Sequence, residues 1–247
     1  MTRPLSDREF LSLWERCSEH HAIDRALLIL HAADPECGPE SLARLAVGER
    51  NLRLLRAHHA MFGHPLAAVS VCSDCDAALE FEVPIDALAN VESEAVENET
   101  SEQEIGGFRL ALRALDSHDL AAAARCADAG EAESLLLSRS VVRLQGSEAP
   151  VAPESLPDDV KHAISEWLSR RDPLADLTFA LTCPECGSPN EAATEIVDLV
   201  WSDIARAASR IFTEVALLAR TYGWQEEQIL TMRPARRRVY LDLGGVG

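Results

Sequence analysis

Apolar residues recur at helical spacing throughout the N-terminal part of the chain. Phe10, Leu13 and Cys17 share one helical face, and Ser6 with Glu9 forms the pattern of a capping box. Helices are expected from residue 6, over 23–33, from 39 and over 47–62. The N-terminal segment is therefore expected to be helical throughout.

A single long apolar stripe dominates the C-terminal part. It predicts one helix over 197–222, ended by Gly223. The stripe consists of Ile196, Val200, Ile204, Ala208, Ile211, Val215, Leu218 and Tyr222. Because such a stripe more often faces a core than a partner, we expect it to pack on the N-terminal helices and close a bundle. A short helix over 225–232 and a last helix from Pro234 follow. This last helix carries the basic cluster Arg236, Arg237 and Arg238.

Strand-forming residues dominate four short runs in the middle of the chain, which cover 67–71, 79–83, 177–181 and 192–197. A long insertion separates the second run from the third. It is expected to hold a strand over 108–115, helices over 118–128, 131–139 and 158–171, and a Pro-containing loop over 145–157. The insertion therefore reads as a small, mostly helical unit.

Acidic residues are concentrated at the start of the insertion. No lysine or arginine occurs between Arg56 and Arg109, whereas eleven acidic residues do. Residues 89–107 have few packing residues and are expected to form a flexible acidic loop. A solvated spacer is favoured over a docking site for a basic partner.

Two Cys-x-x-Cys motifs lie between the strand-forming runs. Cys72 and Cys75 form the first, Cys183 and Cys186 form the second, and 107 residues lie between Cys75 and Cys183. Four thiolates are the ligand set of a closed tetrahedral zinc site. The motifs therefore predict a structural zinc ion in a four-cysteine zinc ribbon, built from two hairpins and interrupted by the insertion.

Other interpretations of the cysteines remain open, namely a redox pair or two unrelated thiol pairs. A redox motif is typical of a strand-to-helix turn, and no helical pattern follows either motif. A catalytic zinc site usually keeps one position open and employs His or carboxylate ligands. Structural zinc is therefore the favoured interpretation.

Composition narrows the function classes. The formal net charge of −18 repels phosphate backbones and disfavours nucleic-acid binding. No secretory segment follows Met1, and no apolar run is long enough to span a bilayer, so we expect a cytoplasmic protein. The total of seven cysteines is odd, and Cys17, Cys37 and Cys126 are expected to be spare thiols.

The histidines invite a metal-site interpretation that we do not favour. The candidates are His20-His21, His58-His59 and His64. Adjacent histidines on a helix point about 100° apart and do not chelate together, so polar helix faces are expected for them. Within the helix over 47–62, however, residues 59–62, which include His59, are expected to face inward.

Several phrases resemble a known family. The run LLARTYGWQEEQIL at 217–230, followed by RRRVYL at 236–241, resembles the ending of T4-type phage baseplate proteins, a family also found in contractile injection systems. The phrases LWER at 13–16, DRALL at 24–28, GERN at 48–51 and FRL at 108–110 resemble the same group, as do the two cysteine motifs. The resemblance implies a structural or assembly role near the hub or tube of a baseplate, and no catalytic residues.

The expected fold is mainly α with a small β zinc ribbon, an α+β protein. Its parts are an N-terminal helical segment (1–64), the first ribbon half (65–84), the acidic loop and helical insertion (85–175), the second ribbon half (176–196) and the C-terminal helices (197–247). The bundle is expected to form from the two terminal segments.

Three functions are weighed. The favoured one is a non-enzymatic component or assembly factor of a contractile-tail baseplate. It would contact other baseplate, hub or tube proteins, alone or as an oligomer in the assembly, with no nucleic acid and no membrane span. It would be cytoplasmic or incorporated into a virion-like or injection particle.

The alternatives are a zinc-ribbon nucleic-acid-binding or regulatory module and a metal-dependent hydrolase. No Gly-x-Ser-x-Gly, phosphate-loop or His-Glu-x-x-His motif supports an enzyme.

Overall fold

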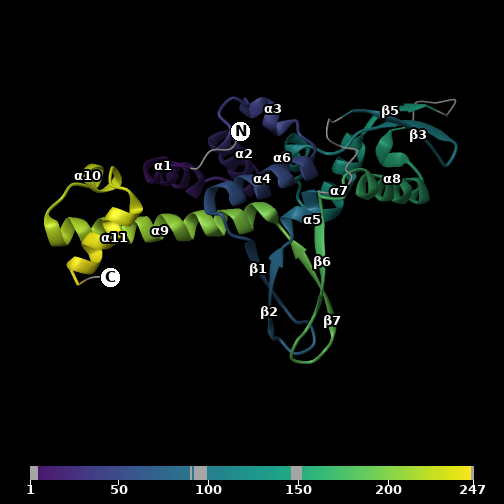
Figure 1. The fold of residues 1–247 in the computed structure, drawn as a ribbon. Coiled ribbons are helices and arrows are strands. Elements are labelled where there is room, and N and C mark those ends of the chain that lie inside the picture. The colour runs from purple at the N-terminus through teal and green to yellow at the C-terminus, as the bar shows by residue number, and fades with distance from the viewer. Residues whose placement is uncertain (1–4, 90, 92–98, 146–151, 246–247) are drawn as a thin grey trace.

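The computed structural model describes residues 5–89, 91, 99–145 and 152–245. It combines helices with small antiparallel sheets, as the sequence predicts. Figure 1 shows a helical body along the longest helix, two hairpins that project from this body, and an insertion at the end opposite the C-terminal helices. The hairpins and the insertion are thus both attached to the helical body.

The N-terminal helices form where the apolar spacing predicts them. They are α1 (Asp7–Ser18), α2 (Ala22–Ala33), α3 (Pro39–Ala43) and α4 (Val47–Phe62). The capping box of α1 is present, because the Ser6 N–H donates to the Glu9 carboxylate over 2.9 Å and the Ser6 hydroxyl accepts from the Glu9 N–H. Gly63 ends α4 in the left-handed region, with a φ of +69°.

The predicted apolar stripe forms α9 (Ile196–Tyr222) and faces the N-terminal helices. The residues of the stripe from Ile196 to Leu218 are buried, and Tyr222 is partly buried. Edge-to-face ring contacts join Trp14 of α1 to Phe212 of α9, with ring centroids 5.3 Å apart. The prediction that the terminal segments pack together is confirmed.

The last two helices, α10 (Glu226–Leu230) and α11 (Pro234–Leu243), fold back on α9. Arg237 of the basic cluster is buried there. Its guanidinium lies 2.5 Å from the Asp7 carboxylate and 2.9 Å from the Glu214 carboxylate, and it donates to the Met232 carbonyl over 3.0 Å. A buried arginine needs such partners, and these tie α11 to both α9 and α1.

Two hairpins carry the cysteine motifs at their turns. The first pairs β1 (Leu66–Val71) with β2 (Ala78–Val83), and the second pairs β6 (Leu177–Thr182) with β7 (Pro189–Thr194). The predicted fourth strand over 192–197 is displaced. β7 ends at Thr194, and Ile196 and Val197, which are β-branched, begin α9 with their side chains in the core.

The insertion contains more strand than the sequence predicts. Its elements are α5 (Ile85–Ala89), β3 (Ser101–Ile105), β4 (Phe108–Leu112), α6 (Ser117–Ala123), α7 (Ala129–Ser140), β5 (Val141–Gln145), the 3-10 turn η1 (Pro153–Ser155) and α8 (Asp158–Arg171). The strands form one antiparallel sheet in the order β3-β4-β5. Leu110 and Leu112 of β4 are buried against Ile164 of α8, so this unit has its own small core.

The prediction of a flexible loop over 89–107 is wrong for its second half. Glu102 and Glu104 lie in β3, because the backbone of β4 offers this polar segment a hydrogen-bonding edge. Gly106 and Gly107 then make the turn with positive φ angles of 57° and 83°. Residues 90 and 92–98, with Glu92, Glu94 and Glu97, lie outside the described residues, as do 146–151 of the predicted 145–157 loop.

Both ends of the insertion are attached to the start of α4. The Val47 N–H donates to the Leu115 carbonyl over 3.0 Å, and the Gly48 N–H donates to the Asp172 carboxylate over 2.9 Å. A Cβ added at Gly48 would lie only 2.0 Å from Asp172 Oδ1, so this approach requires glycine. Burial raises the pKa of Asp172, which caps the helix from a distant segment.

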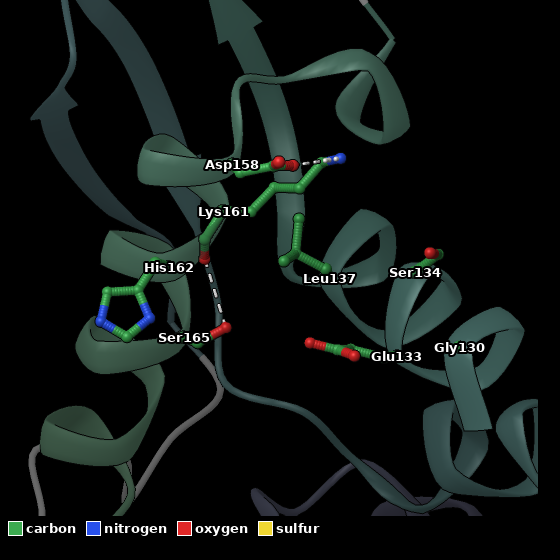
Figure 2. Close-up of a pocket in the computed structure, with 8 residues that line it drawn as sticks. All are labelled: Gly130, Glu133, Ser134, Leu137, Asp158, Lys161, His162 and Ser165. Carbon is green, nitrogen blue, oxygen red and sulfur yellow. Dashed lines mark hydrogen bonds and ion pairs between the residues drawn. The ribbon is translucent and has the colours of Figure 1, made fainter.

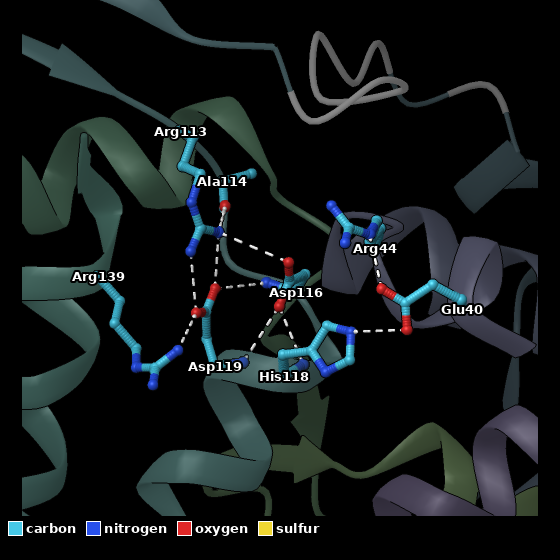
Figure 3. A network of polar contacts seen from close by, with 8 residues as sticks. All are labelled: Glu40, Arg44, Arg113, Ala114, Asp116, His118, Asp119 and Arg139. Atoms are coloured by element: carbon cyan, nitrogen blue, oxygen red, sulfur yellow. Dashed lines mark hydrogen bonds and ion pairs between the residues drawn. The ribbon is translucent and has the colours of Figure 1, made fainter.

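A second polar network lies around the start of α6 (Figure 3). Arg113 makes a two-pronged contact with the buried Asp119 carboxylate at 2.7 and 2.9 Å, and Arg139 adds a contact at 3.2 Å. Burial alone would raise the pKa of Asp119, but the hydrogen bonds from Arg113 and Arg139 bring it below its ordinary value. His118 lies 3.6 Å from Glu40 and links α6 to α3.

Candidate metal centre

The two cysteine-bearing turns have matching backbones. In the first, the Asp76 N–H donates to the Cys72 carbonyl over 3.1 Å, and in the second the Gly187 N–H donates to the Cys183 carbonyl over 2.9 Å. Asp76 and Gly187 both have positive φ angles, 58° and 77°. Glycine and aspartate tolerate this conformation, so each Cys-x-x-Cys closes on itself with its sulfurs on one side.

The structure brings the four predicted cysteines together. The Cys72 and Cys186 sulfurs are 3.6 Å apart, as are the Cys75 and Cys183 sulfurs, and all four lie within 4.8 Å of one another. Zinc–sulfur bonds of about 2.3 Å in a tetrahedron place sulfurs about 3.8 Å apart. A disulfide requires about 2.05 Å, so the spacing suits a shared metal ion rather than a bond between sulfurs.

Asn190 of β7 connects the second hairpin to the first turn. Its side-chain oxygen accepts from the Ser73 N–H over 2.9 Å, and its amide nitrogen donates to the Cys72 sulfur over 3.5 Å. Sequence reasoning missed this residue. The signal was present, because strand alternation places Asn190 on the same buried face as Ala192, where a polar side chain needs a partner.

The electrostatics of the cluster favour a bound cation. The backbone N–H of Asp74 is the main cause that lowers the pKa of Cys72 to about 6. The N–H of Ala77 lowers the pKa of Cys75, but the neighbouring sulfurs, Cys186 first among them, raise it to about 12. Several thiolates this close together repel one another until a cation shares them. The donor set is therefore one that could hold a thiophilic metal ion.

The bases of the hairpins, with Leu66, Val83 and Leu177, are buried in the core of the body, but few apolar contacts among the described residues support the hairpins near their turns. Leu79 is buried against Cys72 and Cys183, and farther from the turns the rings of Phe81 and Phe179 lie 5.3 Å apart. Two-stranded hairpins are marginal by themselves in water. The sulfur cluster is therefore the main cross-link between the two hairpins.

A pocket lies between α7 and α8 of the insertion (Figure 2). The Ser165 hydroxyl donates to the Lys161 carbonyl over 3.2 Å, and the Lys161 ammonium lies 3.5 Å from Asp158. His162 is 3.4 Å from Glu166, its neighbour on the same helix. These described side chains pair locally along α8, and no nucleophile–base pair is formed among them.

His58 and His59 differ from their predictions, whereas His20, His21 and His64 are exposed as expected. His59 is exposed rather than inward, and His58 is the buried member of the pair. The structure also places ligand atoms of His58, His64 and Asp203 within 4.8 Å of one another. Sequence spacing could not reveal this cluster, because Asp203 lies on α9, 145 residues from His58.

Comparison with protein-family models, curated proteins and solved structures finds no match. Among the described residues, no helix is both long and apolar enough to cross a membrane. The function of the chain therefore has to be inferred from its own residues and their geometry.

Proposed function

We propose that Cys72, Cys75, Cys183 and Cys186 hold one structural zinc ion and make the two hairpins a zinc ribbon. The sulfur separations and the mutual repulsion of the thiolates support this assignment. When bound, zinc would supply cross-linking rather than catalysis, because four thiolates leave no coordination position open. Asn190 would orient the Cys72 sulfur through its hydrogen bond.

The function we infer is structural: a non-enzymatic component or assembly factor of a contractile-tail baseplate, acting through protein contacts. The observation that carries it is the sulfur cluster, which joins two hairpins whose cysteines Cys75 and Cys183 have 107 residues between them, and so makes one scaffold of the body, the ribbon and the insertion. The identity of the particle rests on the phrases at 217–230 and 236–241 that resemble baseplate proteins.

The outward face of the first hairpin suits such contacts. Val69 and Val71 are 65% and 61% exposed, and Val69 lies opposite Glu80 in the register. Exposed apolar side chains on a strand beside acidic ones fit a partner with an apolar patch and a basic rim. We therefore propose that neighbouring hub or tube proteins contact this face.

Nucleic-acid binding is the weaker alternative. The hairpin segments 66–83 and 177–194 contain no lysine or arginine, and they carry the acidic residues Asp74, Asp76, Glu80, Glu82, Glu185 and Glu191. Phosphate backbones are held mainly by basic side chains. A salt-sensitive affinity for DNA or RNA would be the result that favours this alternative.

The test is recovery of the tagged chain from a host that produces contractile tails. We expect wild-type protein to co-purify with identified hub, tube or baseplate proteins. The double variant Val69→Ser/Val71→Ser should lose most of that recovery while keeping its fold and metal. Val142→Ser is the control, because Val142 is 55% exposed on β5 of the insertion. Recovery of the wild type as a lone monomer beside intact particles would overturn the proposal.

A further inference from the structure

A second group of metal-ligating side chains lies where α4 leads into the first hairpin. His58 is near the end of α4, and Gly63 turns the chain so that His64 returns beside it, with ring centroids 5.5 Å apart. Asp203 approaches from α9, and its Oδ2 lies 2.8 Å from His58 Nε2. Two imidazoles and one carboxylate, from two helices and one turn, thus converge at one point.

The buried member of this group is incompletely satisfied. His58 is fully buried, and its Nδ1 has no hydrogen-bond partner among the described residues. A buried ring nitrogen without a partner carries a free-energy cost. In the contact with Asp203, the His58 Nε2–H donates to the carboxylate, so the lone pair is on Nδ1. Because no hydrogen bond holds Nδ1, the proton can move there and free Nε2 for an ion. His58 therefore differs from an ordinary buried histidine, whose two ring nitrogens both have hydrogen-bond partners.

The surroundings allow an ion to enter on one side. His64 is exposed, whereas the Phe62 ring packs against both imidazoles, with centroids 4.8 and 5.6 Å away. Arg206 lies 2.8 Å from the other Asp203 oxygen, but its side chain is 73% exposed and can turn away into solvent. The site is thus closed by Phe62 and open to solvent at His64, and Arg206 can leave Asp203 when a metal ion binds.

We propose that His58, His64 and Asp203 form a second metal site, which binds a divalent first-row transition ion such as Zn²⁺ or Co²⁺ reversibly. Imidazole ligands select these ions over Mg²⁺ and Ca²⁺, which prefer all-oxygen sites. Neighbouring ligands of one ion at bond lengths of about 2.1 Å lie about 3 to 3.5 Å apart, so the group needs only a small adjustment. Three protein ligands leave room for water, and the site is weaker than the four-thiolate centre.

The location gives the site a consequence. β1 begins at Leu66, two residues after His64, and Asp203 belongs to the central helix of the body. An ion here joins α4, α9 and the base of the first hairpin at one point. Its occupancy therefore adds to the buried Leu66 and Val83 in holding the base of that hairpin to the body.

The test is a Co²⁺ titration of the full chain with zinc already in the cysteine centre, followed by calorimetry and native mass spectrometry. We expect one further ion per chain, without thiolate-to-cobalt charge-transfer absorption. His64→Ala should weaken this event by about tenfold or more. His59→Ala, an exposed neighbouring histidine outside the cluster, should bind as the wild type does.

Three results would overturn the proposal: no second ion on the wild type, equal binding by His64→Ala, or an equal loss in His59→Ala, which signals ordinary surface-histidine binding. His64→Gln, which keeps a side chain of similar size without an imidazole, serves if His64→Ala does not fold. The near-isosteric Asp203→Asn should weaken the same event and leave the zinc in the cysteine centre.

Discussion

The helical body and the pair of hairpins are held together by different means. The body buries one continuous apolar core from α1, α2, α4 and α9, whereas the fully buried cluster at the hairpin turns consists of Cys72, Leu79 and Cys183. Loss of one apolar side chain leaves most of the core contacts of the body in place. At the hairpin turns, each of the few buried residues contributes a large share of the contacts.

The largest effect is expected from Cys183→Ser. Structural zinc contributes on the order of 10 kcal/mol to the folding of small sites, so loss of one proposed ligand should unfold the hairpins, while the contacts of Val47 and Gly48 keep the insertion on the body. Zinc content and hydrogen exchange over 66–83 and 177–194 measure this. Chelation of the wild type should have the same effect.

Cys126→Ser is the matched control, because this half-buried cysteine of the insertion lies outside the cluster. It should keep the metal and the exchange pattern of the wild type. Full thermal stability of Cys183→Ser would refute the structural role of zinc.

The next largest effect is expected in the body, from Ile204→Ala. Ile204 is fully buried on α9, and truncating such a side chain costs about 2 to 5 kcal/mol in transfer and cavity terms. Urea unfolding should show the loss while the zinc content stays unchanged. Val239→Ala, at a residue 55% exposed on α11, should change the stability by less than about 0.5 kcal/mol. Equal losses in both variants would contradict the core described for α9.

A smaller effect is expected where the insertion meets the body, from Gly48→Ala. The added Cβ overlaps Asp172, and overpacking of this kind costs about 1 to 3 kcal/mol. Faster hydrogen exchange near 46–51 and 172–174 should accompany the loss. Gly130→Ala is the control, since its Cβ meets Asp128 only at 3.4 Å, and alanine in a helix is as good or better. A Gly48→Ala protein as stable as Gly130→Ala would show that the contact yields easily.

The smallest effect is expected in acid, at Asp119. Its folded pKa lies below the ordinary carboxyl value, so its contribution is complete above about pH 4 and is lost as the pH falls toward the folded pKa. Asp119→Asn, although less stable at neutral pH, should show a shallower acid loss in urea unfolding at successive pH values. Asp159→Asn, at an exposed carboxyl of α8, should keep the wild-type slope. An unchanged slope in Asp119→Asn would place the acid sensitivity elsewhere.

Sequence reasoning succeeded where a signal is local. The capping box at Ser6, the bounds of α4 and α8 and the stripe of α9 all follow from helical period and end residues. The two Cys-x-x-Cys motifs predicted their own convergence, because a tetrahedral ion needs both.

It failed where structure depends on a distant partner. β3 is polar enough to read as a loop and becomes a strand only by pairing with β4. The run at 192–197 is rich in strand formers, yet burial against the body makes Ile196 and Val197 helical. Asn190 at the cysteine centre and Asp203 beside His58 were likewise out of reach, since each acts on a residue far away in sequence.

The separation of the two hairpins also bears on synthesis at the ribosome. At about 5 to 20 residues per second, Cys183 follows Cys75 by roughly 5 to 20 s. During that interval the first turn has only two thiols to offer, and the whole insertion must be made before the other two arrive. Loading of the proposed zinc ion would thus be tied to completion of the insertion. A nascent chain that stalls there would expose unpaired thiols to quality control.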